Sequence, residues 1–179
     1  MARSEGKNAK QKSKAKPSAG GRAKKATPDA VHLLKADHRQ VEQWFEQFAK
    51  SRSADKKLVL AQNICKALTV HTRIEEEIFY PAFLKATGDK DIHHEAEIEH
   101  DGAKKLIAQI EGSGPDDDYY DSKVKVLSEM IKHHVKEEEQ RDGMFAEAKK
   151  SEMDLQDLGQ QMKGRKEALM SDMAPSASR

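Results

Sequence analysis

The chain has 179 residues, of which 36% are apolar and 5% aromatic, and its 32 Lys/Arg nearly balance its 31 Asp/Glu. This length fits about one domain, and a composition rich in helix-forming residues favours a small all-α fold over a large sheet. A single cysteine, Cys65, excludes an internal disulfide and is typical of a reducing compartment. Since no segment is typical of a signal peptide or a membrane span, we expect a cytoplasmic protein.

The charges are unevenly distributed along the chain. Residues 1–28 carry nine Lys/Arg and one acid, a net charge of +8, whereas residues 29–179 carry 23 Lys/Arg and 30 Asp/Glu, a net charge of −7. Without aromatics, and rich in Lys, Ala, Gly and Ser, the basic segment is expected to be disordered. Two interpretations of it stay open: non-specific contact with nucleic acid or another polyanion, or a solubilising extension.

Helices are predicted over about residues 28–50, 54–85, 91–111, from 117 to beyond 139, and, more weakly, over 152–171. The first follows Thr27, an N-cap candidate, and Pro28, which is favourable in a first turn. The second ends near Gly88, and the third ends at the Gly-Ser-Gly-Pro cluster of residues 112–115. We expect the fourth to kink or break near Gly143, and no segment shows the alternation typical of a strand.

In each of the four longer helices, apolar residues recur at spacings of three and four. This pattern is typical of a helix face that packs against its neighbours. Polar residues interrupt every one of these faces near its middle or end. The interrupting residues are His38 in the first helix, His71 and Glu75 in the second, His93 and His100 in the third, and His134 and Glu138 in the fourth.

The interruptions repeat along the chain. A lone histidine, His38, precedes the HxxxE of the second helix by 33 residues, and His100 precedes the HxxxE of the fourth by 34. The flanking residues agree, since Asp37-His38 corresponds to Glu99-His100. We interpret the chain as two helical hairpins stacked as a pseudo-two-fold pair. Such a pair would bring together four imidazoles and two carboxylates, from His38, His71, His100, His134, Glu75 and Glu138.

A metal centre is the simplest explanation of this set. Each ionised carboxylate left uncompensated in an apolar interior costs several kcal/mol, and a cation offsets that cost. Residues i and i+4 of a helix lie one above the other, so HxxxE presents both ligands to the same volume. Six ligands exceed the need of one tetrahedral zinc, whereas imidazoles with bridging carboxylates suit a pair of iron ions.

Other histidines and acids are predicted not to bind this metal. A single one of the buried histidines would be explained as a hydrogen-bonded core residue, but the matched spacing in two hairpins favours ligands. His133 heads a competing HxxxE with Glu137, yet the register of His134 continues the apolar spacing of its helix. Glu97, three residues before His100, is an outside candidate. The predicted non-ligands are His32, His93, His94 and His133.

Four stretches together resemble a known family: ADHRQVEQWFEQF, HTRIEEEIFYP, EAEIEHDGAKKLI and HHVKEEE. Their H…HxxxE…H…HxxxE pattern is similar to that of hemerythrin-like proteins, specifically bacterial HHE cation-binding domains, over about residues 29–150. Residues 151–179 are similar to the C-terminal helical extension of many bacterial members, and residues 1–28 remain as the basic tail. The resemblance implies an up-down-up-down four-helix bundle.

The resemblance also implies a non-haem, carboxylate-bridged di-iron site. His38, His71, His100 and His134 would be terminal ligands, and Glu75 and Glu138 would be bridges. Oxygen-carrying hemerythrins add a fifth histidine where this chain has Lys104, and their last carboxylate is an aspartate five residues after its histidine, whereas Glu138 follows His134 by four. These departures weigh against an oxygen carrier.

Two functions follow as hypotheses. The first is a protein that binds dioxygen, nitric oxide or peroxide at a di-iron centre and handles oxidants, with catalase-like decomposition of peroxide as the candidate activity. The alternative is a non-catalytic iron or redox sensor, or an iron store, that is tethered to nucleic acid through its basic tail. A catalyst should not need the tail, whereas a tethered sensor should.

Overall fold

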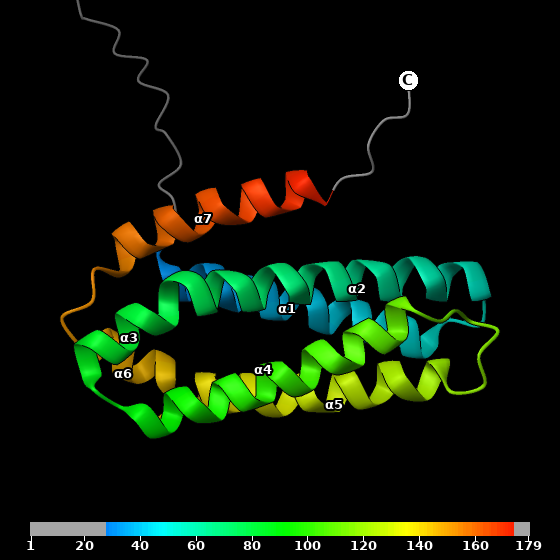
Figure 1. The fold of residues 1–179 in the computed structure, drawn as a ribbon, viewed down its shortest axis with the longest axis horizontal. Helices are drawn as coiled ribbons and strands as arrows, with labels where there is room; N and C mark the ends of the chain where they lie inside the picture. The colour runs from blue at the N-terminus through cyan, green and yellow to red at the C-terminus, as the bar shows by residue number, and fades with distance from the viewer. Residues whose placement is uncertain (1–27, 174–179) are drawn as a thin grey trace, which may run out of the picture.

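The computed structural model describes residues 28–173 (Figure 1). Within this range the chain is helical and contains no strand, which confirms the all-α prediction. The predicted basic tail, apart from its last residue, and residues 174–179 lie outside the described range. None of the helices in the described range combines the length and the apolar character that crossing a bilayer requires.

The helices lie close to the five predicted segments but are more numerous, because the second and fourth segments are each divided. They are α1 (Ala30–Lys50), α2 (Ala54–Ile74), the π-helical turn η1 (Glu75–Phe79), α3 (Tyr80–Thr87), α4 (Lys90–Glu111), α5 (Tyr120–Glu139), α6 (Met144–Lys150) and α7 (Leu155–Asp172). Because α2, η1 and α3 follow one another without a gap, the predicted second helix is continuous but changes its winding on the way.

Short polar side chains fix the starts of four helices. At each start an Asp or Ser oxygen accepts a hydrogen bond from a backbone N–H of the first turn, which satisfies donors that the helix itself leaves unpaired. These N-caps are Asp29, Ser53, Asp89 and Asp154. The prediction that Thr27 caps the first helix is therefore wrong, since Asp29 accepts from the N–H of His32 and α1 begins at Ala30.

The fourth long helix breaks where a break was predicted. It does not run past Glu139, because Gln140 is extended and α6 starts only at Met144. Gly143 precedes α6, and a Cβ at this position would lie 2.0 Å from the carbonyl oxygen of Glu137. The chain can pass so close to the end of α5 only at a glycine, which explains the position of the break.

The four long helices α1, α2, α4 and α5 lie side by side (Figure 1). Helix α1 packs against α2 and α5, and α4 packs against α5 and α2. Apolar side chains form two clusters along this bundle, one containing Leu34 and Ile74 and the other Val41 and Leu68. Helices α1, α2 and α4 each pass from one cluster to the other through their polar interruption, and α6 contributes to the cluster of Leu34 and Ile74 after the polar residues of α5. The predicted ligand residues therefore lie between the two apolar clusters.

Helix α7 lies across the outside of α1 and α2 (Figure 1). It buries Met162 and Leu169, and at Gly159 it approaches so closely that a Cβ would lie 2.4 Å from the carbonyl oxygen of Pro28. Two ion pairs fix its exposed side. Arg165 binds Glu77 of η1 with two nitrogens at 2.6 and 3.0 Å, and Lys166 binds Asp37 of α1.

Candidate metal centre

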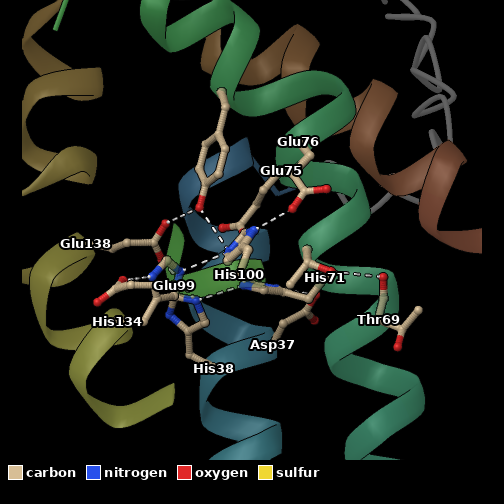
Figure 2. A network of polar contacts seen from close by, with 12 residues as sticks. Asp37, His38, Thr69, His71, Glu75, Glu76, Glu99, His100, His134 and Glu138 are labelled. Atoms are coloured by element: carbon tan, nitrogen blue, oxygen red, sulfur yellow. Dashed lines mark hydrogen bonds and ion pairs between the residues drawn. The ribbon is translucent and has the colours of Figure 1, made fainter. Parts of the chain in front are cut away.

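The six predicted ligand residues meet in the interior between the long helices (Figure 2). None exposes more than 5% of its surface, and Glu75 exposes none. One histidine comes from α1 and one from α4, whereas α2 with η1, and α5, each supply a histidine and a glutamate. The full set is His38, His71, Glu75, His100, His134 and Glu138.

The imidazoles form two pairs through their Nε2 atoms. His38 and His71 lie 3.1 Å apart, and His100 and His134 lie 3.3 Å apart. Each pair joins the two helices of one hairpin, α1 with α2 and α4 with α5. The two hairpins therefore present equivalent pairs of nitrogen ligands to the space between them, which is the pseudo-two-fold arrangement inferred from the repeat.

Each glutamate spans the two imidazole pairs. Glu75 Oε2 lies 3.3 Å from His71 Nε2 and 3.4 Å from His100 Nε2, so it reaches from its own hairpin to the other. Glu138 Oε2 lies 3.7 Å from His134 Nε2 and 3.4 Å from His38 Nε2. Each carboxylate therefore lies between two pairs of imidazole nitrogens, one from each hairpin.

Unpaired buried atoms show that this set fits a metal. Both oxygens of Glu75 and Oε2 of Glu138 are buried without a hydrogen-bond partner. Buried polar groups are almost always hydrogen-bonded, because a buried acceptor without a partner costs about 1–3 kcal/mol. Carboxylate oxygens that lack partners and face imidazole nitrogens fit a transition-metal cation, which accepts both ligand types.

The two buried carboxyls have opposite pKa shifts. Burial favours the neutral form of Glu75, but the imidazoles of His71 and His100 outweigh burial and lower its pKa to about 2. Burial and the nearby charge of Glu75 raise the pKa of Glu138 well above its usual range. Two carboxyls that share one interior cannot both ionise easily unless positive charge is added. A bound cation would therefore stabilise the state in which both Glu75 and Glu138 are ionised.

The imidazoles respond to the same surroundings in different directions. Burial lowers the pKa of His38 to about 4. Burial also acts to lower the pKa of His100, but the nearby carboxylates of Glu75 and Glu76 outweigh it and raise the value to about 9. Metal binding requires the neutral form of a histidine, so a cation must displace the proton of His100.

A second layer of carboxylates holds the imidazoles from outside, and this layer was missed in the sequence. Three of them lie at hydrogen-bond distance from an Nδ1, and Asp37 lies 3.6 Å from Nδ1 of His71. The three short contacts are Glu139 to His38 at 2.8 Å, Glu76 to His100 at 2.9 Å and Glu99 to His134 at 2.6 Å. An Nδ1–H that donates to a carboxylate leaves the Nε2 lone pair for the centre, which fixes the tautomer and the ring orientation.

The sequence does contain a pattern that marks these outer carboxylates. Each outer acid is the immediate neighbour of a predicted ligand, as in Asp37-His38, Glu75-Glu76, Glu99-His100 and Glu138-Glu139. Helix periodicity assigns such neighbours to a different face from the ligand beside them. Each acid serves an imidazole of an adjacent helix, and a contact between helices is not visible in the pattern of one helix.

Tyr80 is a further residue of the centre that the sequence did not indicate. Its hydroxyl lies 3.1 Å from His100 Nε2 and 3.4 Å from Glu138 Oε1. Burial and the nearby glutamates raise the pKa of the phenol well above its usual value, so the hydroxyl stays protonated and donates a hydrogen bond to Glu138 Oε1.

The π-helical turn places Tyr80 at the centre. Successive residues of an α-helix are rotated by about 100°, so Tyr80, five residues after Glu75, would face about 140° away from it. In η1 the N–H of Tyr80 instead bonds to the carbonyl of Glu75, five residues back, so Tyr80 follows Glu75 after one wider turn. The only hint in the sequence is Pro81, which interrupts the regular bonding of a helix.

Three residues lie apart from the six converging residues: the predicted non-ligand His133, the outside candidate Glu97, and Lys104. His133 is 63% exposed and pairs with Glu137 at 3.0 Å, so the fourth helix turns His134 inward as the apolar spacing indicated. Glu97 is 54% exposed and lies 3.6 Å from His93, away from the six converging residues. Lys104 points to the outer layer, where its Nζ lies 2.6 Å from Glu76.

Residues 29–146 match the model of the family described as the hemerythrin HHE cation binding domain. The chain belongs to this family. The matched range contains all six converging residues, the outer carboxylates and Tyr80, and it ends within α6. Membership gives a cation as the expected occupant of the His/Glu cluster, in agreement with the unpaired buried oxygens.

Two similar proteins extend this comparison. A solved hemerythrin HHE cation binding domain-containing protein from Mycobacterium kansasii has a TM-score of 0.68 and 22% identity, with 81% of this chain and 89% of that chain covered, which shows that the two share a fold. A protein described as a DNA nickase from a Nostoc species is 29% identical over 107 residues, or 60% of this chain. The chain spans only 30% of that relative's length.

Proposed function

We propose that the chain binds two iron ions in a non-haem, carboxylate-bridged centre and uses them to bind or react with dioxygen or peroxide. The proposed terminal ligands are His38, His71, His100 and His134, and the proposed bridges are Glu75 and Glu138. The observation that carries the proposal is the position of each glutamate between the two imidazole pairs. Iron, when bound, supplies the redox chemistry, and the bundle supplies ligands and a water-poor interior.

The space beside the centre supports a small ligand. A cavity of about 10 Å³ lies among the four histidines and apolar side chains of Val41, Leu68 and Ile131. This volume is close to the minimum that holds one water molecule. Dioxygen, nitric oxide or hydrogen peroxide is therefore a better match than an organic substrate.

The side chains have separate tasks in this proposal. The outer carboxylates keep Nε2 of each imidazole directed inward, and the apolar clusters on either side exclude water. The phenol of Tyr80 keeps its proton and can donate a hydrogen bond to a small molecule that displaces its contact with His100. For peroxide, a catalase-like reaction would convert two molecules into two of water and one of dioxygen.

Metal content is the test of this proposal. Metal-free protein should be reconstituted with Fe²⁺ without air, desalted and analysed, and we expect about two iron atoms per chain from the six ligands. Addition of hydrogen peroxide should then change the visible spectrum of the iron-loaded protein and release dioxygen. Saturation by one zinc ion with no iron retained would refute the di-iron centre.

The alternative is a sensor or store of iron whose basic N-terminal segment contacts nucleic acid, as the charge of +8 in residues 1–28 suggests. The catalyst and the tethered sensor differ in whether their function requires the basic segment. A catalyst retains its full peroxide turnover without residues 1–26, whereas a tethered sensor loses its partner when they are removed. Peroxide turnover and DNA binding of the shortened chain therefore distinguish them.

A further inference from the structure

A cavity of about 90 Å³ leads from the surface to the centre between α4, α5 and the start of α6. Its wall contains residues of very different exposure. Glu95 and Asp142 are exposed, Glu99 and Glu137 are half-buried, and His134 and Glu138 belong to the centre itself. The cavity is therefore a connection between solvent and two of the proposed ligands.

This cavity is strongly acidic. Its lining includes five carboxylates and no lysine or arginine. A groove of about 370 Å³ on another side of α5 also reaches the centre, at His38, but it is lined by Arg39, Lys132 and Lys136 together with two acids. Electrostatics therefore distinguish the two openings, because a cation is attracted only to the first.

Metal-ligand atoms gather beside this cavity, since Glu99 and Glu137 line it and the exposed His133 lies next to them without lining it. His133 Nε2 lies 3.0 Å from Glu137 and 3.5 Å from Glu99 Oε1, and donor atoms of these three residues all lie within 4.8 Å of one another. The other oxygen of Glu99 contacts His134. Beyond them lies Glu138, whose side chain is only 3% exposed and whose Oε2 has no hydrogen-bond partner.

We propose that this cavity is the entry path for a divalent transition metal, with Glu99, His133 and Glu137 as the site that binds the ion first. The inference rests on the proposed function, since it supplies the ion for the buried centre. One imidazole and two carboxylates form a set that first-row transition metals bind. Three ligands on a partly exposed surface hold an ion weakly enough to pass it to the six ligands inside.

The path is tested by the rate at which metal-free, full-length protein takes up Co²⁺, followed by its visible absorbance after rapid mixing. The variant Glu95→Gln/Asp142→Asn removes two negative charges at the exposed end of the cavity and leaves every converging residue in place. We expect its uptake rate to fall about tenfold at low salt, because a charged cleft raises the local concentration of its ligand. The final amount of bound Co²⁺ and the melting temperature should not change.

A matched variant controls for the general charge of the protein. Glu97→Gln/Glu129→Gln removes the same number of acids, one from α4 and one from α5, at positions that are 54% and 64% exposed and do not line the cavity. We expect this variant to load Co²⁺ at the rate of the unmodified chain. Equal slowing by both variants would overturn the path, since charge anywhere on these helices would then suffice.

The remaining outcomes separate the path from the function. If the unmodified chain loads Co²⁺ and the cavity variant loads it equally fast, the path is wrong while the centre stands. If the unmodified chain takes up no Co²⁺ and no Fe²⁺, the proposed centre is wrong, and the path is refuted with it.

Discussion

At the scale of single residues, the centre depends on what lies behind each imidazole. His38 receives its orientation from Glu139, which in turn contacts Lys35 and Arg39 of α1. The hydrogen bond to His38 outweighs the effect of burial and lowers the pKa of Glu139 to about 2, so this carboxylate is anionic at neutral pH. A negative partner at Nδ1 makes Nε2 a more basic ligand.

Replacement of Glu139 by Gln should therefore weaken metal binding without removing it. The amide can still accept a hydrogen bond from His38 but lacks the charge, and we expect about a tenfold loss of metal affinity, at the low end for such partners. Competition with a chelator measures this loss. Glu42→Gln is the control, since Glu42 pairs with Arg39 at the surface and does not contact His38. Equal affinity of both variants would contradict the role of Glu139.

Removal of a proposed ligand should have a larger effect. His71→Ala and His134→Ala should each lose most of the bound metal, and with it the stability that the metal adds to the folded state. His133→Ala should retain equilibrium metal content and melting temperature, because this exposed histidine lies outside the six converging residues. Metal analysis and thermal melts check this prediction. If metal binding required His133, the register assigned to α5 would be wrong.

At the scale of secondary-structure elements, two glycines of α7 differ in whether they contact another part of the chain. In α7, Gly159 faces the backbone of Pro28 and Ala30, where a Cβ would approach to 2.4 and 2.8 Å. Gly164 of the same helix has nothing within 4 Å of such a Cβ. The first glycine permits close packing, whereas the second only lowers the helix propensity of α7.

The two glycines predict opposite effects of the same substitution. Gly159→Ala should destabilise the protein by about 1–3 kcal/mol, because α7 must move away from α1 to admit the methyl group. Gly164→Ala should stabilise it by up to about 1 kcal/mol through helix propensity. Denaturant unfolding followed by circular dichroism measures both values. A stabilising Gly159→Ala would show that α7 does not pack as described.

The same scale shows how far the sequence could predict this protein. Periodicities of three and four identified the long helices and the inward positions of His71 and His134, because ligand residues replace apolar ones on a buried face. Tyr80 was not predicted as a residue of the centre, because the π-helical turn changes the helical period just before it. Asp37 and Glu99 were not predicted either, because the histidines that they contact lie on adjacent helices. The pattern of a single helix does not show contacts between helices.

At the scale of the whole molecule, α7 is connected to the centre through charged side chains. Lys166 binds Asp37, and the other oxygen of Asp37 faces Nδ1 of His71. Arg165 holds Glu77 in the π-helical turn, next to Glu76, which contacts His100. The C-terminal helix therefore supports both sides of the first hairpin at the level of the metal ligands.

The basic segment gives a prediction for the whole chain. Its nine Lys/Arg should allow weak binding to duplex DNA that decreases steeply with salt and shows little sequence preference. A shortened chain beginning at Thr27 should not bind, because the remainder is acidic. Binding measured by fluorescence anisotropy at several salt concentrations checks this. Metal content should be the same in both chains, and equal DNA binding by both would exclude a role for the segment.

The π-helical turn gives the first hairpin a tolerance for length. Deletion of one residue between Glu75 and Tyr80 would restore α-helical winding and leave the tyrosine four residues after Glu75, which is still about one turn and keeps it on the face of His100. The second hairpin can absorb length elsewhere, because α5 has already ended at Glu139 and the loop before α6 can take an added residue. Single-residue changes of length accumulated during evolution should therefore fall at residues 75–80 or after Glu139 and avoid the rest of the long helices.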